Sequence, residues 1–547
     1  MRSLPQTSSD VNSTTPWILA IDLGNGGPKV AVVALDGDIL GTGFQPVAVD
    51  IGLDGKATQD ATEWDQALQS AIAGAIANAV VDPQRLHAIG ITGQWGSTVP
   101  VGADGDPVGP VLLWADTRAK KYAREIVGGP VSVSGFAPHK VLPFVRLTGG
   151  APSPSGADPT GHSMLLQHEL RDVGKQCRWL LEPVDYLAFR LTGRAAATPA
   201  SMILSWLTDN RPDAPLGYLP QLVKRARRDP ELLPELLPTG SVQGTLLPDV
   251  AATLGLPAGV PVMCGIPDLH AAIIGSGAIE PFDTHVAIST TAWISARVPF
   301  KKTDVLHSIA TVPGLDPRYQ LVGNNAETGG AALSWMREQV IAPHDGLIGG
   351  GSGIGAEGAA PPYYPPTFDD MNALAATVPA GSEGVLFTPW LAGERTPVED
   401  KHLRGTWVNL SLRTTRAIMI RSVMEGVALN MRWMFGYYEK FLGQPVPSLR
   451  MLGGGAKSEL WCAIMASVLD RRIEQVGDPM HAQLRGTALW ARVCLGEITL
   501  KQAADLVPVG ATFDPDPRDR RVYAKSFDEY RRLYGTLKGT YHRLNAR

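Results

Sequence analysis

The chain has 547 residues, so we expect more than one domain and large buried cores. Its 49 Lys and Arg residues nearly balance its 53 Asp and Glu residues, and the formal net charge is −4. This balance, with no block of basic residues, argues against a nucleic-acid partner. No apolar run reaches membrane-spanning length, so we expect no membrane partner either.

The N-terminal segment MRSLPQTSSDVNSTTP is polar and lacks the apolar stretch of a signal peptide. We therefore expect a disordered lead-in over residues 1–16. The 4 cysteines lie far apart and form no CxxC pair, which is typical of reduced cysteines in a cytoplasmic protein.

The segment 18–40, ILAIDLGNGGPKVAVVALDGDIL, predicts two strands joined by a glycine-rich turn. Glycine allows positive φ and lets backbone N–H groups approach a ligand closely. Asp22 ends the first predicted strand, where it could hold a metal ion or a bridging water beside a phosphate. The local pattern also fits a plain β-hairpin with a solvated Asp22, and short glycine motifs match by chance.

Strands and helices alternate through the first half of the chain, which predicts an α/β fold. A helix is predicted at 63–80, a strand at 87–92 and another helix at 180–191. A short strand at 261–265 precedes Asp268 and a helix of small residues at 269–277.

The second half begins with a strand, turn and strand at 285–298 that is weakly similar to segment 18–33. A domain boundary near residues 280–284 follows. Residues 344–366 are rich in Gly and Pro and predict an irregular loop, either a mobile surface insertion or a lid over a substrate or nucleotide.

Four further helices and one strand are predicted in the second half of the chain. The strand at 449–452 ends in three glycines and leads directly into a helix, which offers backbone donors and a positive dipole end to a nucleotide. The basic and aromatic C-terminal segment predicts a packed terminal helix, with a partner-binding helix as the alternative. The four helices are expected at 327–339, 414–440, 458–469 and 527–544.

Ordered sequence segments resemble the FGGY carbohydrate kinases, most closely their xylulokinase-like branch, over nearly all of residues 17–491. The resemblance is carried by IDLGNGGPK, IGITGQWGSTVPVGADGDPVGPVLLWADTRA, EPVDYLAFRLTG, GIPDLHAAIIGSGAIEPFD, NALAATVPAGSEGVLFTPWLAGERTPVED, RSVMEGVALNMR and MLGGGAKSELW. Such an ordered series is far more specific than one glycine turn.

The resemblance implies an α/β protein with two actin-like, ribonuclease-H-like domains and an interdomain cleft. On this basis residues 17–282 form an N-terminal domain that binds sugar and carries the catalytic base. Residues 283–507 form a C-terminal domain that binds ATP, and residues 508–547 form a helical tail. The implied partners are a small sugar or polyol and ATP with Mg²⁺, and we leave open whether the protein forms a homodimer.

The implied reaction transfers the γ-phosphoryl group of ATP to a sugar hydroxyl, which requires a base, Mg²⁺ and donors for the phosphoryl oxygens. Asp268 matches the catalytic aspartate of the family, and a helix N-cap is its alternative role. We expect Asp268 to contact substrate and metal as well. Asp22 matches the aspartate of the first phosphate loop and would act through Mg²⁺ or its waters.

The resemblance also places the contacts to ATP and to sugar. In the first loop Lys29 could contact phosphate, although a solvated lysine fits equally well. The ATP-binding residues implied are Asn25, Gly26, Lys29, Thr290, Thr291, Gly330, Gly454 and Gly455. The substrate-binding residues implied are Gln94, Trp95, Asp116 and Asp268, with Arg118 completing a W-x-D-x-R pattern. Glu394, Arg395 and Thr396 of the GERTP segment are expected to support the cleft.

Several positions depart from the family pattern. Asn25 and Gly26 replace the usual Thr-Ser, and the second loop reads Ser289, Thr290, Thr291, Ala292 in place of Gly-Thr-Ser-Gly. Leu269 replaces an Asn, and the pocket histidine of xylulokinases is replaced by Gly96 beside Trp95. These changes argue against D-xylulose as the substrate and leave a catalytically impaired sugar-binding or regulatory relative as the alternative.

Overall fold

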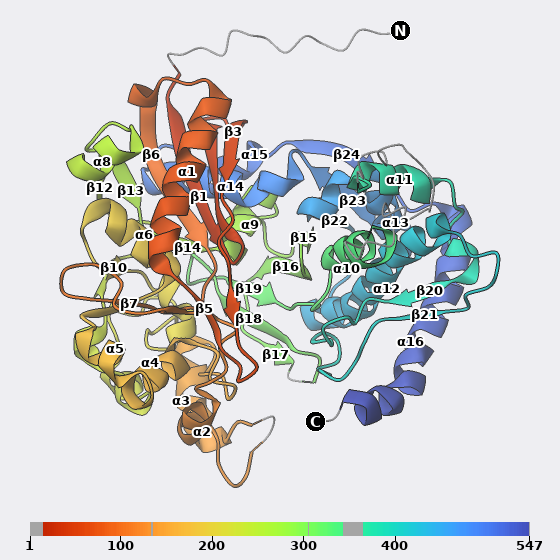
Figure 1. The fold of residues 1–547 in the computed structure, drawn as a ribbon, viewed down its shortest axis with the longest axis horizontal. Coiled ribbons are helices and arrows are strands. Elements are labelled where there is room, and N and C mark those ends of the chain that lie inside the picture. Colours follow the sequence, from red (N-terminus) through yellow and green to blue (C-terminus); the bar gives the residue numbers. More distant parts are fainter. Residues whose placement is uncertain (1–14, 133–134, 305, 343–364, 546–547) are drawn as a thin grey trace, which may run out of the picture.

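The computed structural model describes residues 15–132, 135–304, 306–342 and 365–545 (Figure 1). Most of the expected lead-in, residues 1–16, and of the expected loop at 344–366 lies outside these ranges. None of the described helices is both long and apolar enough to cross a membrane.

Two large sheets organise the described residues. The first is 7-stranded and runs in the order β12 (Val242–Thr245), β13 (Pro261–Met263), β6 (Leu86–Gly93), β1 (Trp17–Gly24), β2 (Gly27–Ala34), β3 (Ile39–Phe44), with β14 (Ile266–Pro267) also paired to β6. The second is 8-stranded, in the order β17 (Thr303–Asp304), β18 (Ile309–Pro313), β19 (Gln320–Gly323), β16 (Ala292–Val298), β15 (Thr284–Ile288), β22 (Ser448–Leu452), β23 (Arg472–Val476), β24 (Val509–Phe513).

The two sheets repeat one local topology. In the first sheet β1 pairs antiparallel with β2 and parallel with β6, and in the second β15 pairs antiparallel with β16 and parallel with β22. Each hairpin is therefore flanked by one parallel strand on the side away from its partner. The weak sequence similarity of segments 18–33 and 285–298 therefore reflects two hairpins in the same topological position.

The apolar side chains form layers on both faces of each sheet. Alternate residues of β1 point to opposite cores: Leu19 packs with α1 (Ala61–Ala79) and α6 (Pro183–Thr192), while Ile18 and Ala20 pack with α14 (Ala482–Cys494). The second sheet packs one face on α12 (Arg416–Leu442) and α13 (Glu459–Leu469). Because both faces are covered, these strands are continuous apolar runs in the sequence.

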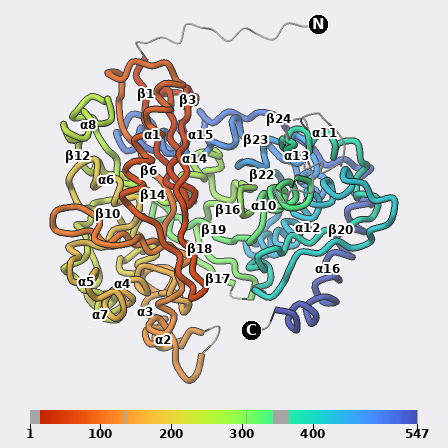
Figure 2. The backbone as a smooth tube through the Cα atoms, in the orientation of Figure 1, coloured from red at the N-terminus to blue at the C-terminus, as the bar shows by residue number. Residues whose placement is uncertain are grey.

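The opposite face of the second sheet packs on α9 (Asp268–Ser276), α14 and α15 (Leu500–Asp505). Helix α14 thus contributes to a core with each sheet. Figure 2 shows α14 beside strands β1 and β2, which are far from it in sequence. Helices α9 and α14 form the layer shared by the two halves of the molecule.

The remaining elements surround these layers. The helices are α2 (Lys120–Val127), α3 (Pro138–Thr148), α4 (Pro159–His168), α5 (Arg171–Gln176), α7 (Pro220–Arg225), α8 (Pro248–Leu254), α10 (Ala331–Trp335), α11 (Phe368–Ala376) and α16 (Pro517–Asn545). The small sheets pair β4 (Asp50–Ile51), β5 (Ala57–Gln59) and β8 (Val111–Leu112); β7 (Val99–Val101) and β9 (Trp179–Leu181); β10 (Ala196–Ala197) and β11 (Glu235–Leu236); and β20 (Leu386–Thr388) and β21 (Thr406–Val408).

Helices α9 and α14 touch backbone to backbone. A Cβ atom at Gly275 of α9 would overlap the carbonyl oxygen of Ala482, and one at Gly486 of α14 would overlap that of Ala271. Buried Arg485 extends the junction, because its Nε donates to Gly37 O at 2.9 Å and its Nη1 to Gly477 O at 2.6 Å. The two glycines allow an approach that larger residues exclude.

Most predicted elements are present, with local differences in extent. The helix expected at 180–191 begins only at Pro183, because residues 179–181 form β9. The helix expected at 327–339 begins at Ala331 and continues as a π-helix over Met336–Ile341. The expected helical tail, 508–547, starts instead with β24, which pairs with β23 and extends the second sheet.

The predicted packing of the C-terminal helix is confirmed. Helix α16 lies against α12 and α13 (Figure 1), and its buried Tyr523, Tyr530 and Tyr541 belong to the core that contains these helices. Tyr523 Oη donates to Glu425 Oε1 at 2.8 Å and Tyr530 Oη to Asn430 Oδ1 at 2.9 Å. These bonds fasten α16 to α12.

The close helix contact gives a stability prediction. Gly486→Ala should lower the free energy of unfolding by about 1–3 kcal/mol, because its methyl group must push α14 away from α9. Gly436→Ala is the matched control: Gly436 is exposed within α12, and a Cβ there meets no atom within 4 Å. Differential scanning calorimetry should show a gain of up to about 1 kcal/mol for the control. Equal effects of the two substitutions would contradict the packing argument.

Candidate active site

Three predicted site residues lie at the carboxyl ends of neighbouring strands. Asp22 of β1 lies opposite Thr92 of β6 in the sheet register. Thr92 in turn lies opposite Ile266 of β14. The Thr92 hydroxyl donates to Ile266 O at 2.8 Å, which fixes β14 against β6. Asp268 begins α9 directly after β14, and Gln94 follows β6. Since neighbouring strands are about 4.8 Å apart, these side chains occupy one edge of the sheet.

Burial and charge perturb the two carboxyl groups. Asp22 is only 5% exposed, and burial raises its pKa above the usual range, while the charge of Lys29 opposes this shift. Asp268 is half-buried, and burial together with the negative charge of Asp22 raises its pKa to about 7. Its Oδ1 also accepts a hydrogen bond from Leu269 N at 2.7 Å. Two acids of this kind on one sheet edge are typical of catalytic sites.

The first hairpin turn, residues 24–27, carries the predicted Asn25 and Gly26. Asn25 is exposed, and its carbonyl oxygen accepts a hydrogen bond from Gln59 Nε2 at 2.8 Å. Gly27 has a φ of 120°, and a Cβ there would overlap Gln45 O, so the turn requires glycine at this position. Lys29 is exposed on β2, directly opposite Asp22 in register.

The second hairpin turn, residues 289–291, contains the predicted Thr290 and Thr291. Its backbone is held by the segment before α10: Gly330 N donates to Ser289 O at 2.6 Å, and Gly329 N to Thr290 O at 2.9 Å. A Cβ at Gly330 would lie 2.6 Å from Ser289 O. The turn and the start of α10 are therefore one compact unit, and the side chain of Thr290 is exposed.

The glycines after β22 join this unit. Gly453 has a φ of 88°, and a Cβ on it would lie 2.6 Å from Ile288 O. Gly454 is exposed with open space around its Cα, whereas Gly455 packs on the Ile288 side chain. The structure thus brings together Thr290, Thr291, Gly330, Gly454 and Gly455.

Helix α9 connects the two groups of predicted residues. It begins at Asp268 on the edge of the first sheet and contacts β16 and β22 of the second. Asp22, Lys29, Gln94 and Asp268 thus lie where α9 begins, and strands β16 and β22 next to the second turn pack along the same helix.

Gln94 and Trp95 follow β6. Gln94 is 5% exposed and its N donates to Leu23 O at 2.9 Å, while no described residue is a hydrogen-bond partner of its Nε2. Trp95 packs edge-on against His270, with ring centroids 6.1 Å apart. His270 is buried and donates from Nε2 to Pro313 O at 2.9 Å, and burial lowers its pKa to about 4, so the ring is neutral.

Gly96, which replaces the expected pocket histidine, has its own fixed partner. Its N donates to Glu182 Oε2 at 2.9 Å, and its φ is 77°. Glu182 is buried, and burial with the nearby Asp185 raises its pKa well above the usual range. Sequence reasoning missed Glu182, because a Glu before a Pro gives no signal beyond a helix start.

The Asp116 carboxylate is already engaged within the protein. It is 0% exposed and binds Arg118 through three hydrogen bonds, of which the shortest joins Arg118 Nη2 to Oδ2 at 2.6 Å. It also accepts from Ala57 N at 3.2 Å. This arrangement suits orientation of Arg118, and a direct contact of Asp116 with substrate stays a prediction.

Glu394 of the GERTP segment is a buried structural acceptor. It accepts hydrogen bonds from Glu327 N at 2.9 Å, Arg395 N at 2.8 Å and Asn430 Nδ2 at 2.6 Å. Burial raises its pKa to about 7. These bonds link the segment to α12, in agreement with the support role expected for it.

Trp114 was not singled out in the sequence, although it is the first residue of the W-x-D-x-R pattern. The side chain is 38% exposed, and its Nε1 donates to Asn25 Oδ1 at 3.1 Å. Its backbone N donates to Ser97 Oγ at 3.0 Å. Trp114 therefore joins the first turn to the segment after β6.

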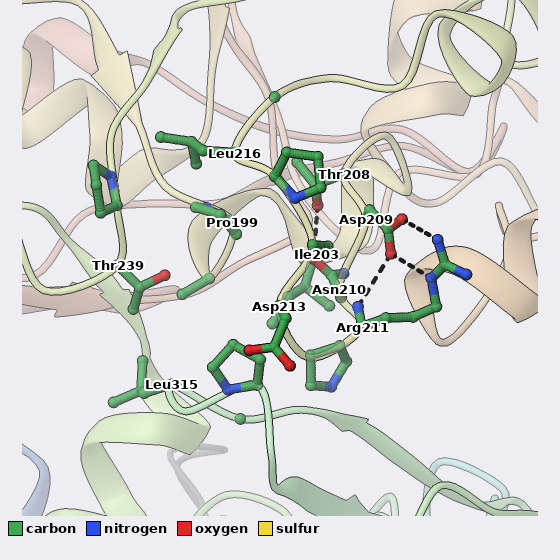
Figure 3. Close-up of a pocket in the computed structure, with 18 residues that line it drawn as sticks. Pro199, Ile203, Thr208, Asp209, Asn210, Arg211, Asp213, Leu216, Thr239 and Leu315 are labelled. Atoms are coloured by element: carbon green, nitrogen blue, oxygen red, sulfur yellow. Dashed lines mark hydrogen bonds and ion pairs between the residues drawn. The ribbon is translucent and has the colours of Figure 1, made fainter.

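A separate cavity of about 300 Å³ lies between residues 199–217, 238–239 and 313–317 (Figure 3). Leu216, Thr239 and Leu315 line it, and the Asp209 carboxylate pairs with Arg211 at its side. None of the predicted site residues lines this cavity. Pro313 does, so the cavity borders α9 through the bond from His270.

Comparison with known proteins identifies the chain's family. The N-terminal domain model of the FGGY family of carbohydrate kinases matches residues 17–137, and the C-terminal domain model matches residues 290–495, together more than half of the 547 residues. The chain belongs to this family. It is a carbohydrate kinase.

Curated relatives align along almost the full length of this kinase. A xylulose kinase of Lactococcus lactis is 24% identical over 96% of this chain and 98% of its own. A gluconokinase of Bacillus subtilis is 23% identical over 95% and 94%. These relatives support kinase activity and not the alternative of a catalytically impaired sugar-binding or regulatory protein.

Solved structures share the fold. A ligand-bound xylulose kinase from Lactobacillus acidophilus has a TM-score of 0.78 at 21% identity, covering 97% of this chain and 100% of its own. A glycerol kinase from Plasmodium falciparum with ADP has a TM-score of 0.73 at 16% identity, covering 94% and 97%. The predicted α/β fold with two actin-like domains is confirmed.

The raised pKa of Asp268 predicts a pH-dependent effect on stability. The folded protein holds this proton up to about pH 7, whereas the unfolded chain loses it near pH 4. Unfolding therefore releases the proton between these values, and wild-type stability falls as pH rises through this window. Asp268→Asn should raise the melting temperature of the ligand-free kinase by a few degrees at pH 8 and hardly at pH 4.5. An equal shift at both pH values in scanning fluorimetry would contradict the assignment.

Proposed function

We propose that this kinase transfers the γ-phosphoryl group of ATP to a hydroxyl of a sugar or polyol, with Asp268 as the general base. The observation that carries the proposal is the placement of Asp268 at the start of α9, beside Asp22, with a pKa of about 7. A base with a pKa near the working pH exists partly as carboxylate and can still take a proton effectively.

In the proposed reaction Asp268 accepts the proton of the substrate hydroxyl. The hydroxyl oxygen then forms a bond to the γ-phosphorus, while the bond from that phosphorus to the β–γ bridging oxygen breaks and ADP leaves. Lys29, opposite Asp22 on β2, would place a positive charge near the phosphoryl oxygens. The half-buried position of Asp268 leaves its carboxylate accessible to a substrate hydroxyl.

The residues at this edge fit a magnesium ion held jointly with nucleotide phosphates. Among the described residues no group of three or more His, Cys, Asp or Glu side chains could hold a metal alone. Mg²⁺ commonly uses one or two carboxylates and takes its other ligands from phosphates and water. Asp22 and Asp268 are the two carboxylates that would hold it, and the ion would neutralise phosphate charge.

We assign the nucleotide to the second turn and the glycines around it. Thr290 is exposed there, and Gly330 and Gly453 leave no room for a Cβ against the turn backbone. Gly454 has open space around it, which suits the close approach of an adenosine. In the first turn, Asn25 and Gly26 would face the phosphates from the other domain.

The sugar would lie beside Gln94 and Trp95. The Nε2 of Gln94 is buried with no partner in the described part of the chain, which favours a ligand that offers an acceptor oxygen. The neighbouring Trp95 offers an indole in place of a polar side chain. Since relatives are named for xylulose and for gluconate, we include both compounds in the substrate test and expect a ketose, polyol or sugar acid other than D-xylulose to be preferred.

The purified protein with MgATP should release ADP only when a suitable acceptor is added. The panel holds D-xylulose, D-gluconate and further ketoses, polyols and sugar acids, and mass spectrometry identifies the phosphorylated product. Asp268→Asn should lower kcat by about a hundredfold or more while sugar binding persists, because the variant lacks the base. Sugar-independent ATP hydrolysis, or saturable sugar binding without any turnover, would contradict the proposal.

The pH dependence of the reaction gives a second test. At MgATP concentrations well below its KM, so that the enzyme free of metal and nucleotide titrates, kcat/KM for the sugar should fall below about pH 7 as Asp268 becomes protonated. The fall should approach tenfold per pH unit well below this value. A flat profile between pH 5.5 and pH 8.5 in steady-state kinetics would exclude Asp268 as the base.

A further inference from the structure

A continuous series of hydrogen bonds connects the first turn with the segment that follows β6. We call it the Asn25–Gln94 network. Its members lie on five different segments and are Trp64, Gln59, Asn25, Trp114, Ser97 and Gln94. Trp64, Gln59, Ser97 and Gln94 are buried, so the network is anchored at both ends in the protein interior.

At the turn end, both oxygens of Asn25 are occupied. Gln59 Nε2 donates to the backbone carbonyl, and Trp114 Nε1 donates to Oδ1 at 3.1 Å. Gln59 is itself oriented by Trp64 Nε1, which donates to its Oε1 at 3.2 Å. An indole N–H can only donate, so the amide orientation of Asn25 is determined. Its Nδ2 has no hydrogen-bond partner among the described residues and remains a free donor.

The far end has the same arrangement. The Ser97 hydroxyl accepts from Trp114 N at 3.0 Å and donates its single proton to Gln94 Oε1 at 3.2 Å. With its oxygen occupied, Gln94 presents Nε2, which is buried and unpartnered in the described part of the chain. The network therefore contains two amide donors, Asn25 Nδ2 and Gln94 Nε2, which are linked through Trp114 and Ser97.

This geometry gives Asn25 a role that a hydroxyl residue at the same place would not fill equally. In a side-chain amide the oxygen accepts from Trp114 while the nitrogen donates to a ligand. The two atoms lie in one plane, so fixing the oxygen also fixes the nitrogen. A free donor at the first turn suits a phosphoryl oxygen, and one at Gln94 suits a sugar oxygen. Trp114 lies between them in the network: its ring N–H donates to Asn25, and its backbone N donates to Ser97, which in turn donates to Gln94.

We infer that Asn25 is a positioning residue that couples the nucleotide side of the site to the sugar side through Trp114. The inference rests on the proposed function, since it takes the ligand of Asn25 Nδ2 to be a phosphoryl group. It accounts for the departure from the usual Thr-Ser: the lost hydroxyls are replaced by one oriented amide. Removal of the Trp114 indole N–H should then weaken nucleotide binding, although Trp114 lies on the sugar side.

The test measures binding of MgAMP-PNP, a non-hydrolysable ATP analogue, by isothermal titration calorimetry without sugar. We expect Asn25→Ala to weaken binding about tenfold and Trp114→Phe several-fold, the scale of a single hydrogen bond. The double variant should bind no more weakly than Asn25→Ala alone, because both changes break one interaction. Trp490→Phe is the matched control, because the Trp490 Nε1 has no partner in the described residues. This variant should bind MgAMP-PNP with the affinity of the wild type.

A second variant separates the two functions of the amide. Asn25→Asp keeps an acceptor for Trp114 but places a negative charge toward the phosphates. It should weaken MgAMP-PNP binding more than tenfold and leave KM for the best panel sugar within about twofold of the wild type. Asn25→Ala should raise KM for both substrates. Melting temperatures confirm that each variant is folded, and Asn25 and Trp114 are both at the surface.

Three results would overturn the inference. Wild-type affinity in Trp114→Phe, or effects that multiply in the double variant, would show that Asn25 and Trp114 act independently. A raised sugar KM in Asn25→Asp equal to that in Asn25→Ala would show that the Trp114 contact has no role. If the wild type itself does not bind MgAMP-PNP, the proposed function fails and the inference fails with it, which is distinct from the first three outcomes.

Discussion

The backbone contact between α9 and α14 is the constraint on which the rest of the structure depends. Gly275 and Gly486 let the two helices approach so closely that a single methyl group at either position would overlap a carbonyl oxygen. Helix α14 shares a core with each sheet, and α9 begins at Asp268. The position of the proposed base relative to the second sheet is therefore set by a contact that contains no functional group.

Each half of the protein presents a hairpin turn flanked by a parallel strand. The two turns differ in the chemistry of the residues around them. The first turn lies beside buried Asp22 and half-buried Asp268, and burial together with the charge of Asp22 raises the pKa of Asp268 to about 7. In the described part of the chain, the backbone hydrogen bonds of the second turn involve no carboxyl group. Glycines at the start of α10 and after β22 have no side chain, so these two segments pack closely against the backbone of the turn. One topology thus supplies an acidic side, which carries the proposed base, and a side that suits a nucleotide.

Much of the fold could be predicted, because both faces of each sheet are covered. Strand β1 begins with the apolar run 17–21 and β15 is buried throughout, and the small-residue helix after Asp268 appears where it was expected. The tail was harder: β24 alternates exposed and half-buried residues at a sheet edge, so residues 509–513 give a weak strand signal. The π-helix at Met336–Ile341 lies in a run whose sequence reads as ordinary helix.

The sequence by itself determined the family and predicted Asp22, Asp268 and the glycines of the turns as site residues, because these positions belong to ordered motifs. Only the tertiary structure decided what the residues around them do. Asp116 is saturated by Arg118, Gly96 is held by Glu182, and Asn25 is oriented by Trp114, which lies 89 positions away. Such contacts join segments that no local pattern relates, since a hydrogen bond depends on distance in space and not on spacing along the chain.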